Sequence, residues 1–317
     1  MNKRVLGRTG IEVSEISFGT VSIGIPYGIG AKGQNQMLPE DKAIRLLRTG
    51  LDNGINFFDT ARLYGRSEEL IGKVCASRRD EVVICTKCTH LRKNGELPSD
   101  GQLQQIIDLS FSQSLRYLQS DYVDVYMIHN ADLEILDNNR IAEIFNEYKT
   151  KGLARAIGVS VYSIEETRKA IESGVWDVIQ LSYNLMDQRQ AELFSFASQK
   201  GVGIVVRSVL FKGILTDKGS SLHSNLKAIE QHRNLYNSLL TNKVPTLYDL
   251  AIKFVLSNKE VSSALIGIDR KEYLDKAVAL ADGDFLDEQT MSKVKKLVYP
   301  DPDFLNLPKW DRLGWLK

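Results

Sequence analysis

The chain has 317 residues, 43% of them hydrophobic and 26% charged, which is ordinary for a globular protein and excludes a disordered or fibrous chain. Its 41 basic and 40 acidic residues leave a net charge of +1, which argues against a nucleic-acid-binding surface. Three cysteines, an odd number, are too few for a secreted disulfide framework. The first residues carry charge with no apolar run behind them, and no apolar run reaches about 18 residues. We therefore expect a cytoplasmic protein without a signal peptide or membrane contact.

Short runs rich in β-branched and aromatic residues recur along the chain. Each run is apolar on both faces, which is typical of strands in a buried parallel sheet. The predicted strands are, in chain order, residues 15–18, 55–58, 81–86, 122–128, 154–159, 178–181, 203–206 and 264–268.

Segments with helical spacing of apolar residues lie between most of these strands. The predicted helices cover residues 41–53, 68–77, 103–118, 141–149, 164–172, 191–199 and 245–256. Gly54, Gly152, Gly174 and Gly201 each follow a helix and precede a strand, where a left-handed residue commonly ends a helix.

Eight strands alternating with helices predict an α/β fold of the (β/α)8 or TIM-barrel type. The open doubly wound sheet is the main rival, but no G-x-G-x-x-G turn follows an early strand. Residues 3–13 predict a β-hairpin around Arg8-Thr9-Gly10 that plugs the barrel bottom, and extra helices are expected near the C-terminus. We expect residues 1–317 to form a single barrel domain, with a long loop at 21–38 and a tail at 299–317.

Ionisable side chains follow three of the apolar runs at the point where each predicted strand ends. Asp59 ends the second strand with Tyr64 five residues on, Lys87 ends the third, and His129 ends the fourth. The active site of such a barrel lies at the carboxyl ends of its strands, so we expect these side chains to meet.

The chemistry of these four residue types is coherent. A lysine ammonium lowers the pKa of a nearby phenol from its usual value of about 10. An aspartate beside the lysine keeps it charged, and a histidine hydrogen-bonds a substrate oxygen beside the tyrosine. Together they predict a proton donor and acceptor aimed at one oxygen, as carbonyl reduction or alcohol oxidation requires.

The order and spacing of several motifs agree with one known family. They are Leu6–Gly10 (LGRTG), Ser17–Thr20 (SFGT), Gly54–Ala61 (GINFFDTA), Tyr64-Gly65, Thr86-Lys87, His129, Gly158–Ser160 (GVS) and Gly213–Leu215 (GIL). On these motifs the chain resembles an aldo-keto reductase from about residue 5 to about residue 280. The resemblance implies hydride transfer from NADPH, or less often NADH, to a carbonyl carbon. It implies Tyr64 as general acid, Lys87 and Asp59 as the groups that tune it, and His129 as the residue that orients the carbonyl.

The resemblance also implies where the cofactor binds. Ser160 and Gln180 match positions that hold the nicotinamide carboxamide, whereas Arg207 departs from the family pattern because it stands where many relatives stack an aromatic ring on the nicotinamide. Residues 208–213 match the segment around the pyrophosphate, and residues 267–271 the loop that meets the adenosine phosphate. The implied cofactor residues are Thr20, Ser160, Gln180, Arg207, Ser208, Leu210, Lys212, Gly213, Gly267, Arg270 and Lys271.

The chain departs from the family pattern near both ends of the expected cofactor site. Val161 stands where many relatives have asparagine, and Asp269 where a basic or hydroxyl residue is common. A carboxylate repels a 2′-phosphate, whereas Arg270 and Lys271 attract one. Family usage nevertheless predicts NADP(H) over NAD(H), and no metal is expected because Cys85 and Cys88 have no second pair of ligands.

The sequence leaves the substrate and the oligomeric state open. We expect a small aldehyde, ketone or sugar-derived carbonyl, with Tyr27 in the long first loop as a substrate contact. The tail at 299–317 either lines the substrate mouth, packs on the barrel or makes a subunit contact. The alternative to an enzyme is a cofactor-binding regulatory or scaffold subunit, as some relatives are for membrane channels.

Overall fold

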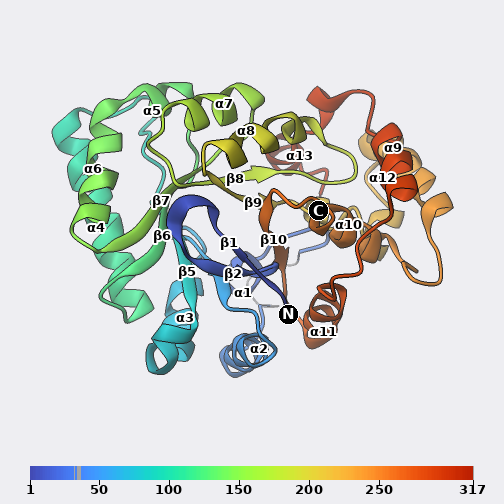
Figure 1. The fold of residues 1–317 in the computed structure, drawn as a ribbon, viewed down its shortest axis with the longest axis horizontal. Coiled ribbons are helices and arrows are strands. Elements are labelled where there is room, and N and C mark those ends of the chain that lie inside the picture. The colour runs from blue at the N-terminus through green and yellow to red at the C-terminus, as the bar shows by residue number, and fades with distance from the viewer. Residues whose placement is uncertain (32, 34–36, 317) are drawn as a thin grey trace.

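The protein is a closed ring of eight parallel strands surrounded by helices, which confirms the predicted TIM barrel (Figure 1). A computed structural model describes residues 1–31, 33 and 37–316; residues 32 and 34–36 of the long first loop lie outside the described part. The ring runs in the order β10-β3-β4-β5-β6-β7-β8-β9. Its strands are β3 (Ile16–Gly19), β4 (Phe57–Asp59), β5 (Val83–Lys87), β6 (Val123–Ile128), β7 (Ala154–Ser160), β8 (Val178–Ser182), β9 (Gly203–Arg207) and β10 (Val261–Gly267).

Helices follow most of the barrel strands, and several more are added towards the C-terminus, as predicted. They are α1 (Val21–Gly24), α2 (Glu40–Asp52), α3 (Ser67–Cys75), α4 (Asp100–Leu118), α5 (Leu133–Asp137), α6 (Asn139–Thr150), α7 (Ile164–Glu172), α8 (Phe194–Gln199), α9 (Lys227–Leu235), α10 (Leu247–Leu256), α11 (Lys271–Leu280), α12 (Glu288–Lys296) and α13 (Leu307–Arg312). None of the described helices combines the length and apolar character that crossing a bilayer needs.

The N-terminal hairpin closes one end of the barrel, as the sequence predicted. Its strands β1 (Lys3–Val5) and β2 (Glu12–Ser14) pair antiparallel, and Figure 1 shows them lying across the ring. Leu6, Ile11 and Val13 are at most 2% exposed and pack inside the barrel with interior residues such as Phe57 and Met127. Burying each such side chain contributes roughly 1.5–3 kcal/mol, so the hairpin completes the inner core.

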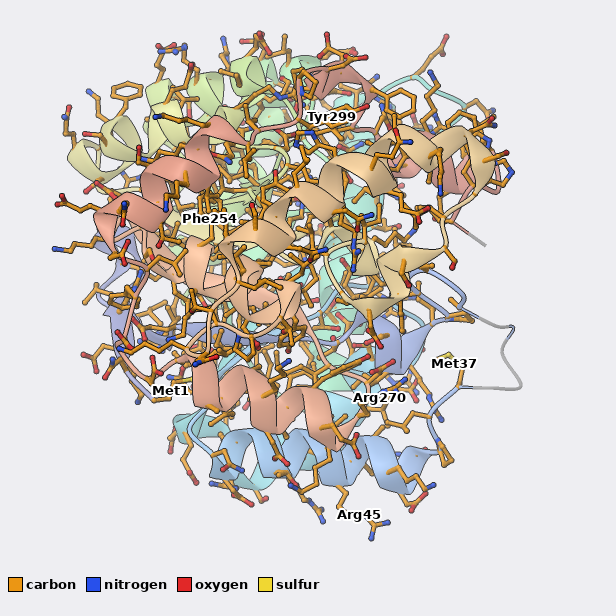
Figure 2. The ribbon with its side chains drawn as sticks, turned by 90° about the vertical axis from the view of Figure 1, so that its right-hand side faces the viewer. Met1, Met37, Arg45, Phe254, Arg270 and Tyr299 are labelled. Carbon is orange, nitrogen blue, oxygen red and sulfur yellow. The ribbon has the colours of Figure 1, made fainter. Side chains whose placement is uncertain are left out.

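A second apolar layer lies between the strands and the outer helices. Helix α2 illustrates it: Ala43 and Leu47 are fully buried towards the barrel, whereas Arg45 points into solvent. Figure 2 shows α11 lying beside α2, with Arg270 at the start of α11. The predicted left-handed glycines are also confirmed; Gly54 and Gly201, for example, have φ values of 90° and 68°.

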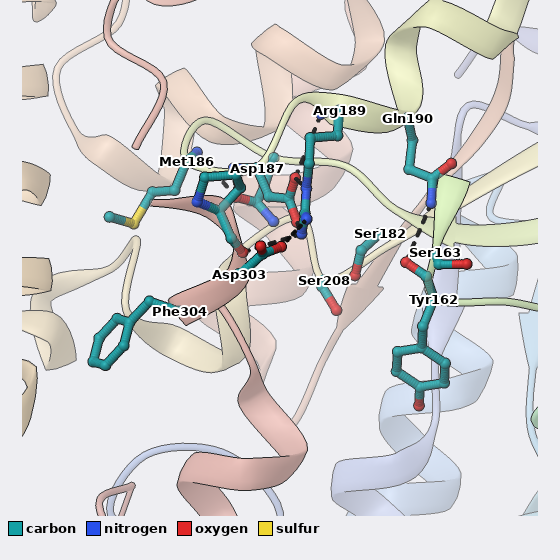
Figure 3. Close-up of polar contacts among 12 residues, drawn as sticks. Tyr162, Ser163, Ser182, Met186, Asp187, Arg189, Gln190, Ser208, Asp303 and Phe304 are labelled. Carbon is teal, nitrogen blue, oxygen red and sulfur yellow. Dashed lines mark hydrogen bonds and ion pairs between the residues drawn. The ribbon is translucent and has the colours of Figure 1, made fainter. Parts of the chain in front are cut away.

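The tail is tied to the barrel through the loop after β8. Arg189 makes two bonds of 2.9 Å to Asp187, and it reaches Asp303 at 3.1 Å and the Pro302 carbonyl at 3.1 Å (Figure 3). Further along the tail, the Trp310 ring is fully buried, so part of the tail packs on the barrel.

Candidate active site

A cleft of about 610 Å³ lies at the carboxyl ends of the barrel strands. It contains nearly all the side chains that the sequence singled out. Those that line it are Thr20, Tyr27, Asp59, Tyr64, His129, Ser160, Gln180, Arg207, Ser208, Leu210, Lys212, Gly213 and Gly267. Lys87 lies behind the cleft wall, and Arg270 and Lys271 lie outside the lining.

Asp59 and Lys87 form a buried ion pair at the centre of this site. They come from the ends of the adjacent strands β4 and β5, so parallel pairing brings them together. Lys87 Nζ lies 2.6 Å from Asp59 Oδ1 and 2.9 Å from the Thr60 carbonyl. The other carboxylate oxygen of Asp59 accepts a 2.7 Å bond from Gln180 Nε2 on β8. Both side chains of the pair are 1% exposed, so each charge depends on the other for compensation.

The pKa of Lys87 and that of Tyr64 are shifted by the same set of groups. Burial alone lowers the pKa of Lys87, but Asp59 and Tyr64 raise it further than burial lowers it, so the ammonium keeps its proton. Burial raises the pKa of Tyr64, and Asp59 adds to this, while Lys87 lowers it. Lys87 therefore acts in the predicted direction, but the net pKa of Tyr64 lies above its usual value because burial has the larger effect.

Two glycines let the backbone that carries Tyr64 approach helix α1 closely. A Cβ at Gly24 would lie 1.9 Å from the Tyr64 carbonyl oxygen, and a Cβ at Gly65 would lie 2.4 Å from the Gly24 carbonyl oxygen. Gly65 also has a φ of 55°, which L side chains rarely adopt. The centroid of the Tyr64 ring lies 5.1 Å from Lys87 Nζ, so the ammonium behind the cleft wall is close to the phenol that lines the cleft.

His129 completes this end of the cleft as a neutral imidazole. Its ring meets the Tyr64 ring edge to face, with centroids 5.4 Å apart. Burial lowers its pKa to about 3, and the nearby charges of Lys87, His90 and Arg207 act in the same direction. His90, to which the sequence assigned no role, stacks on His129 with ring centroids 5.4 Å apart. Its position in the loop after β5 gave no sign of this contact.

Ser160, Gln180 and Arg207 come from the neighbouring strands β7, β8 and β9 and line the cleft beside the catalytic candidates. The amide nitrogen of Gln180 is already bonded to Asp59, which leaves its carbonyl oxygen as an acceptor. The Ser160 hydroxyl supplies both a donor and an acceptor. This donor and acceptor set fits a carboxamide group.

The segment after β9 bends through several left-handed residues. Ser208, Phe211 and Lys212 have positive φ values of 58°, 46° and 58°. Lys212 Nζ lies 2.6 Å from Asp311 of α13 and 4.9 Å from the centroid of the Tyr27 ring. A cation on a tight turn suits an anionic group. The ring of Tyr27, from the first loop, lies next to the Lys212 ammonium.

The loop predicted to meet the adenosine phosphate places a carboxylate in the cleft. Asp269 lines the cleft and pairs with Arg270 at 3.4 Å. Lys271 pairs with Asp275 at 2.5 Å, and Arg270 also lies over the Tyr273 ring at 4.9 Å. Both predicted phosphate-binding cations therefore have carboxylate partners.

The model of the aldo/keto reductase family matches residues 15–298, which is most of the chain. The chain belongs to the aldo/keto reductase family. It is similar to L-galactose dehydrogenase of Arabidopsis thaliana, with 28% identity over 94% of each chain. It is also 28% identical to a probable voltage-gated potassium channel subunit beta of the same plant, over 95% of this chain and 98% of that one.

The fold agrees with a solved member of this family. Aldo-keto reductase AKR11C1 from Bacillus halodurans, in its holo form, superimposes with a TM-score of 0.79 at 26% identity, covering 95% of this chain and 99% of that chain.

Several residues of this aldo/keto reductase line the cleft without a signal in the sequence. They are Ser22, Ile25, Pro26, Tyr162, Lys218, Tyr248, Tyr273, Leu307, Pro308, Asp311 and Leu316. Most come from the long first loop, in which the sequence analysis named only Tyr27, and from the tail at 299–317. Cys85 and Cys88 are free and buried, and no cluster of metal-ligand side chains occurs among the residues that the structure describes.

Proposed function

We propose that this aldo/keto reductase is an enzyme that transfers hydride between NAD(P)H and the carbonyl of a small aldehyde, ketone or sugar-derived substrate. The observation that carries the proposal is the grouping of Tyr64, His129 and the Asp59–Lys87 pair at one end of one cleft. Family members carry out this chemistry with a nicotinamide cofactor, and the side chains beside this group fit such a cofactor.

In the proposed mechanism the bound nicotinamide supplies the hydride, and the chain supplies the proton. The Tyr64 hydroxyl donates its proton to the carbonyl oxygen as the carbon becomes an alcohol. The Lys87 ammonium stabilises the phenolate that this leaves, and Asp59 holds Lys87 in its charged form. His129, neutral because its pKa is lowered to about 3, hydrogen-bonds the same oxygen without competing as a proton donor.

The residues proposed to hold the cofactor span the length of the cleft. Gln180 and Ser160 would bind the carboxamide, and Lys212 with its turn would bind the pyrophosphate. At the adenosine end, Asp269 would oppose a 2′-phosphate, while the charges of Arg270 and Lys271 are offset by carboxylates. We therefore propose that NADH binds as well as the NADPH that family usage favours, with Asp269 reducing the advantage of NADPH.

A regulatory subunit is the second candidate, favoured by the similarity to a potassium channel subunit beta. The chain is equally identical, at 28%, to a dehydrogenase, so sequence similarity alone does not distinguish an enzyme from a regulatory subunit. The two are separated by whether Tyr64 performs chemistry, because a cofactor sensor has no need of a proton donor.

The test compares wild type with Tyr64→Phe, using Tyr122→Phe as a matched control outside the cleft. Binding of the reduced cofactor is followed by the quenching of tryptophan fluorescence. Turnover is followed by the loss of cofactor absorbance with a panel of carbonyl compounds. We expect Tyr64→Phe to bind cofactor normally and to lose roughly 10²–10⁴-fold in turnover, while the control keeps most of its activity. Cofactor binding without turnover on any carbonyl would favour the regulatory candidate, and binding of neither NADPH nor NADH would refute both.

A further inference from the structure

Arg207 introduces a permanent positive charge into the reacting end of the cleft. Its side chain is fixed from three sides: it donates to the Val161 carbonyl at 2.9 Å, to Ser182 Oγ at 2.9 Å and to Ser208 Oγ at 3.3 Å. The Tyr162 ring lies 4.2 Å from the guanidinium carbon. An arginine held in this way keeps both its place and its charge.

All of these partners are neutral. The described part of the chain places no carboxylate in an ion pair with Arg207, and its Nε is buried without a hydrogen-bond partner. The catalytic carboxylate, Asp59, is already bonded to Lys87 and Gln180. Because Asp59 and Lys87 offset each other and His129 is neutral, Arg207 adds a positive charge to the reacting end of the cleft that no carboxylate of the described residues offsets.

This charge lies close to the reacting atoms. Arg207 lines the same cleft as Tyr64 and His129, and its charge lowers the pKa of both. A carbonyl that accepts a proton from Tyr64 must also accept hydride from the nicotinamide ring, so the ring has to approach this same end. The nicotinamide ring is neutral when reduced and carries a positive charge when oxidised.

We propose that Arg207 makes the site discriminate between the two redox forms of its cofactor, binding NAD(P)H more tightly than NAD(P)+. This inference rests on the proposed function. Hydride leaves the reduced ring for the carbonyl carbon, the Tyr64 proton goes to the oxygen, and the ring that remains is a cation beside Arg207. Repulsion then promotes release of the oxidised cofactor after carbonyl reduction and opposes its entry for alcohol oxidation.

The test measures the dissociation constants of the reduced and oxidised cofactors for wild type, Arg207→Gln and Arg207→Lys by calorimetric titration. We expect wild type to prefer the reduced form by about tenfold or more, since unit charges a few ångström apart in a partly desolvated site interact this strongly. Arg207→Gln keeps hydrogen-bonding groups but carries no charge. It should therefore bring the ratio of the two dissociation constants close to one. Arg207→Lys keeps the charge and should keep most of the preference.

The ratio of the two constants is internal to each protein, so partial misfolding of a variant does not change it. Equal affinity of wild type for both redox forms would overturn the inference without any variant. So would an equal loss of affinity for both forms in Arg207→Gln, which would make Arg207 an ordinary contact. In either case the proposed function stands, because the cofactor still binds; binding of neither form to wild type would refute the proposed function as well.

Discussion

Breaking the Asp59–Lys87 pair from one side should cost far more stability than removing both charges. The two atoms are 2.6 Å apart and both side chains are 1% exposed, so solvent gives little compensation to a charge left alone. Lys87→Met leaves a buried carboxylate, and Asp59→Asn leaves a buried ammonium. Each should reduce the free energy of unfolding by about 3–5 kcal/mol.

The double variant Asp59→Asn with Lys87→Met leaves no buried charge. Its main defect is the Thr60 carbonyl, which loses the 2.9 Å bond from Lys87, at a cost of about 1–3 kcal/mol. The amide that replaces the Asp59 carboxylate in that variant retains an oxygen to accept from Gln180. The double-mutant cycle should therefore give a coupling energy of at least about 3 kcal/mol, at or above the top of the usual range.

The assay is thermal unfolding, followed by circular dichroism, together with turnover for each variant. The single variants should unfold on the order of 5–10 °C lower than wild type, and the double variant should recover much of this loss. Turnover should not recover, because Tyr64 has lost the ammonium that stabilises its phenolate. Removing Lys87 also raises the pKa of Tyr64 further, so the rise of alcohol oxidation with pH should move to higher pH.

The exposed pair Arg45–Asp41 on α2 is the control. Its atoms lie 2.8 Å apart, but its side chains are 73% and 66% exposed, so removing either partner should change the free energy of unfolding by less than about 0.5 kcal/mol. The argument from burial would be refuted if Asp59→Asn and Lys87→Met each changed the free energy of unfolding as little as the control variants do, and if the two effects were additive in the double variant.

Three further predictions concern other parts of the site. Gly24→Ala places a Cβ 1.9 Å from the Tyr64 carbonyl oxygen, so turnover should fall about 100-fold as Tyr64 shifts, whereas Gly101→Ala, with no atom within 4 Å, should leave it unchanged. The pKa of His129 is about 3 in the folded protein against about 6.5 unfolded, so its contribution to stability is complete above pH 6.5 and is lost as the pH falls towards 3. Urea unfolding at pH 6.5 and 4.5 should show a loss of about 1 kcal/mol per pH unit that His129→Asn removes; an unchanged slope would contradict this assignment. Asp269→Asn should raise the affinity for NADPH relative to NADH by about fivefold in parallel titrations, and an unchanged ratio would show that Asp269 does not face the 2′-phosphate.

The sequence predicted the barrel and the positions of its strands because that information is local. The apolar runs that predict strands and the helical spacing that predicts helices are both read from residues close together in the chain. The beginning of β10 shows the limit: the prediction started at Ala264, whereas the strand starts at Val261. The intervening Ser262 and Ser263 look polar in the sequence, but the hairpin supplies carbonyl acceptors for both, at Val5 and Ser14.

The grouping of the four catalytic candidates was also predictable, because they follow three apolar runs and a parallel barrel brings all strand ends to one face. Tertiary structure alone decided how they are charged. The sequence predicted that Lys87 lowers the pKa of Tyr64, and in the structure Lys87 acts in this direction. The net pKa of Tyr64 is nevertheless raised, because burial of the phenol has the larger effect. The burial of the Tyr64 ring depends on every element packed around it, so it cannot be predicted from the residues next to Tyr64 in the chain.

Contacts between distant segments were beyond the sequence for the same reason. Lys212, for example, is held by Asp311, which lies 99 residues later in the chain. Arg207 was noticed as a departure from the family pattern, but its fixed, unpaired charge became evident only from its neutral partners on β8 and in the segments that follow β7 and β9. The periodicity of the chain determined the barrel and the face that carries the chemistry; the packing of its long loops and tail determined the electrostatics of the site, because charge and solvation depend on neighbours in space.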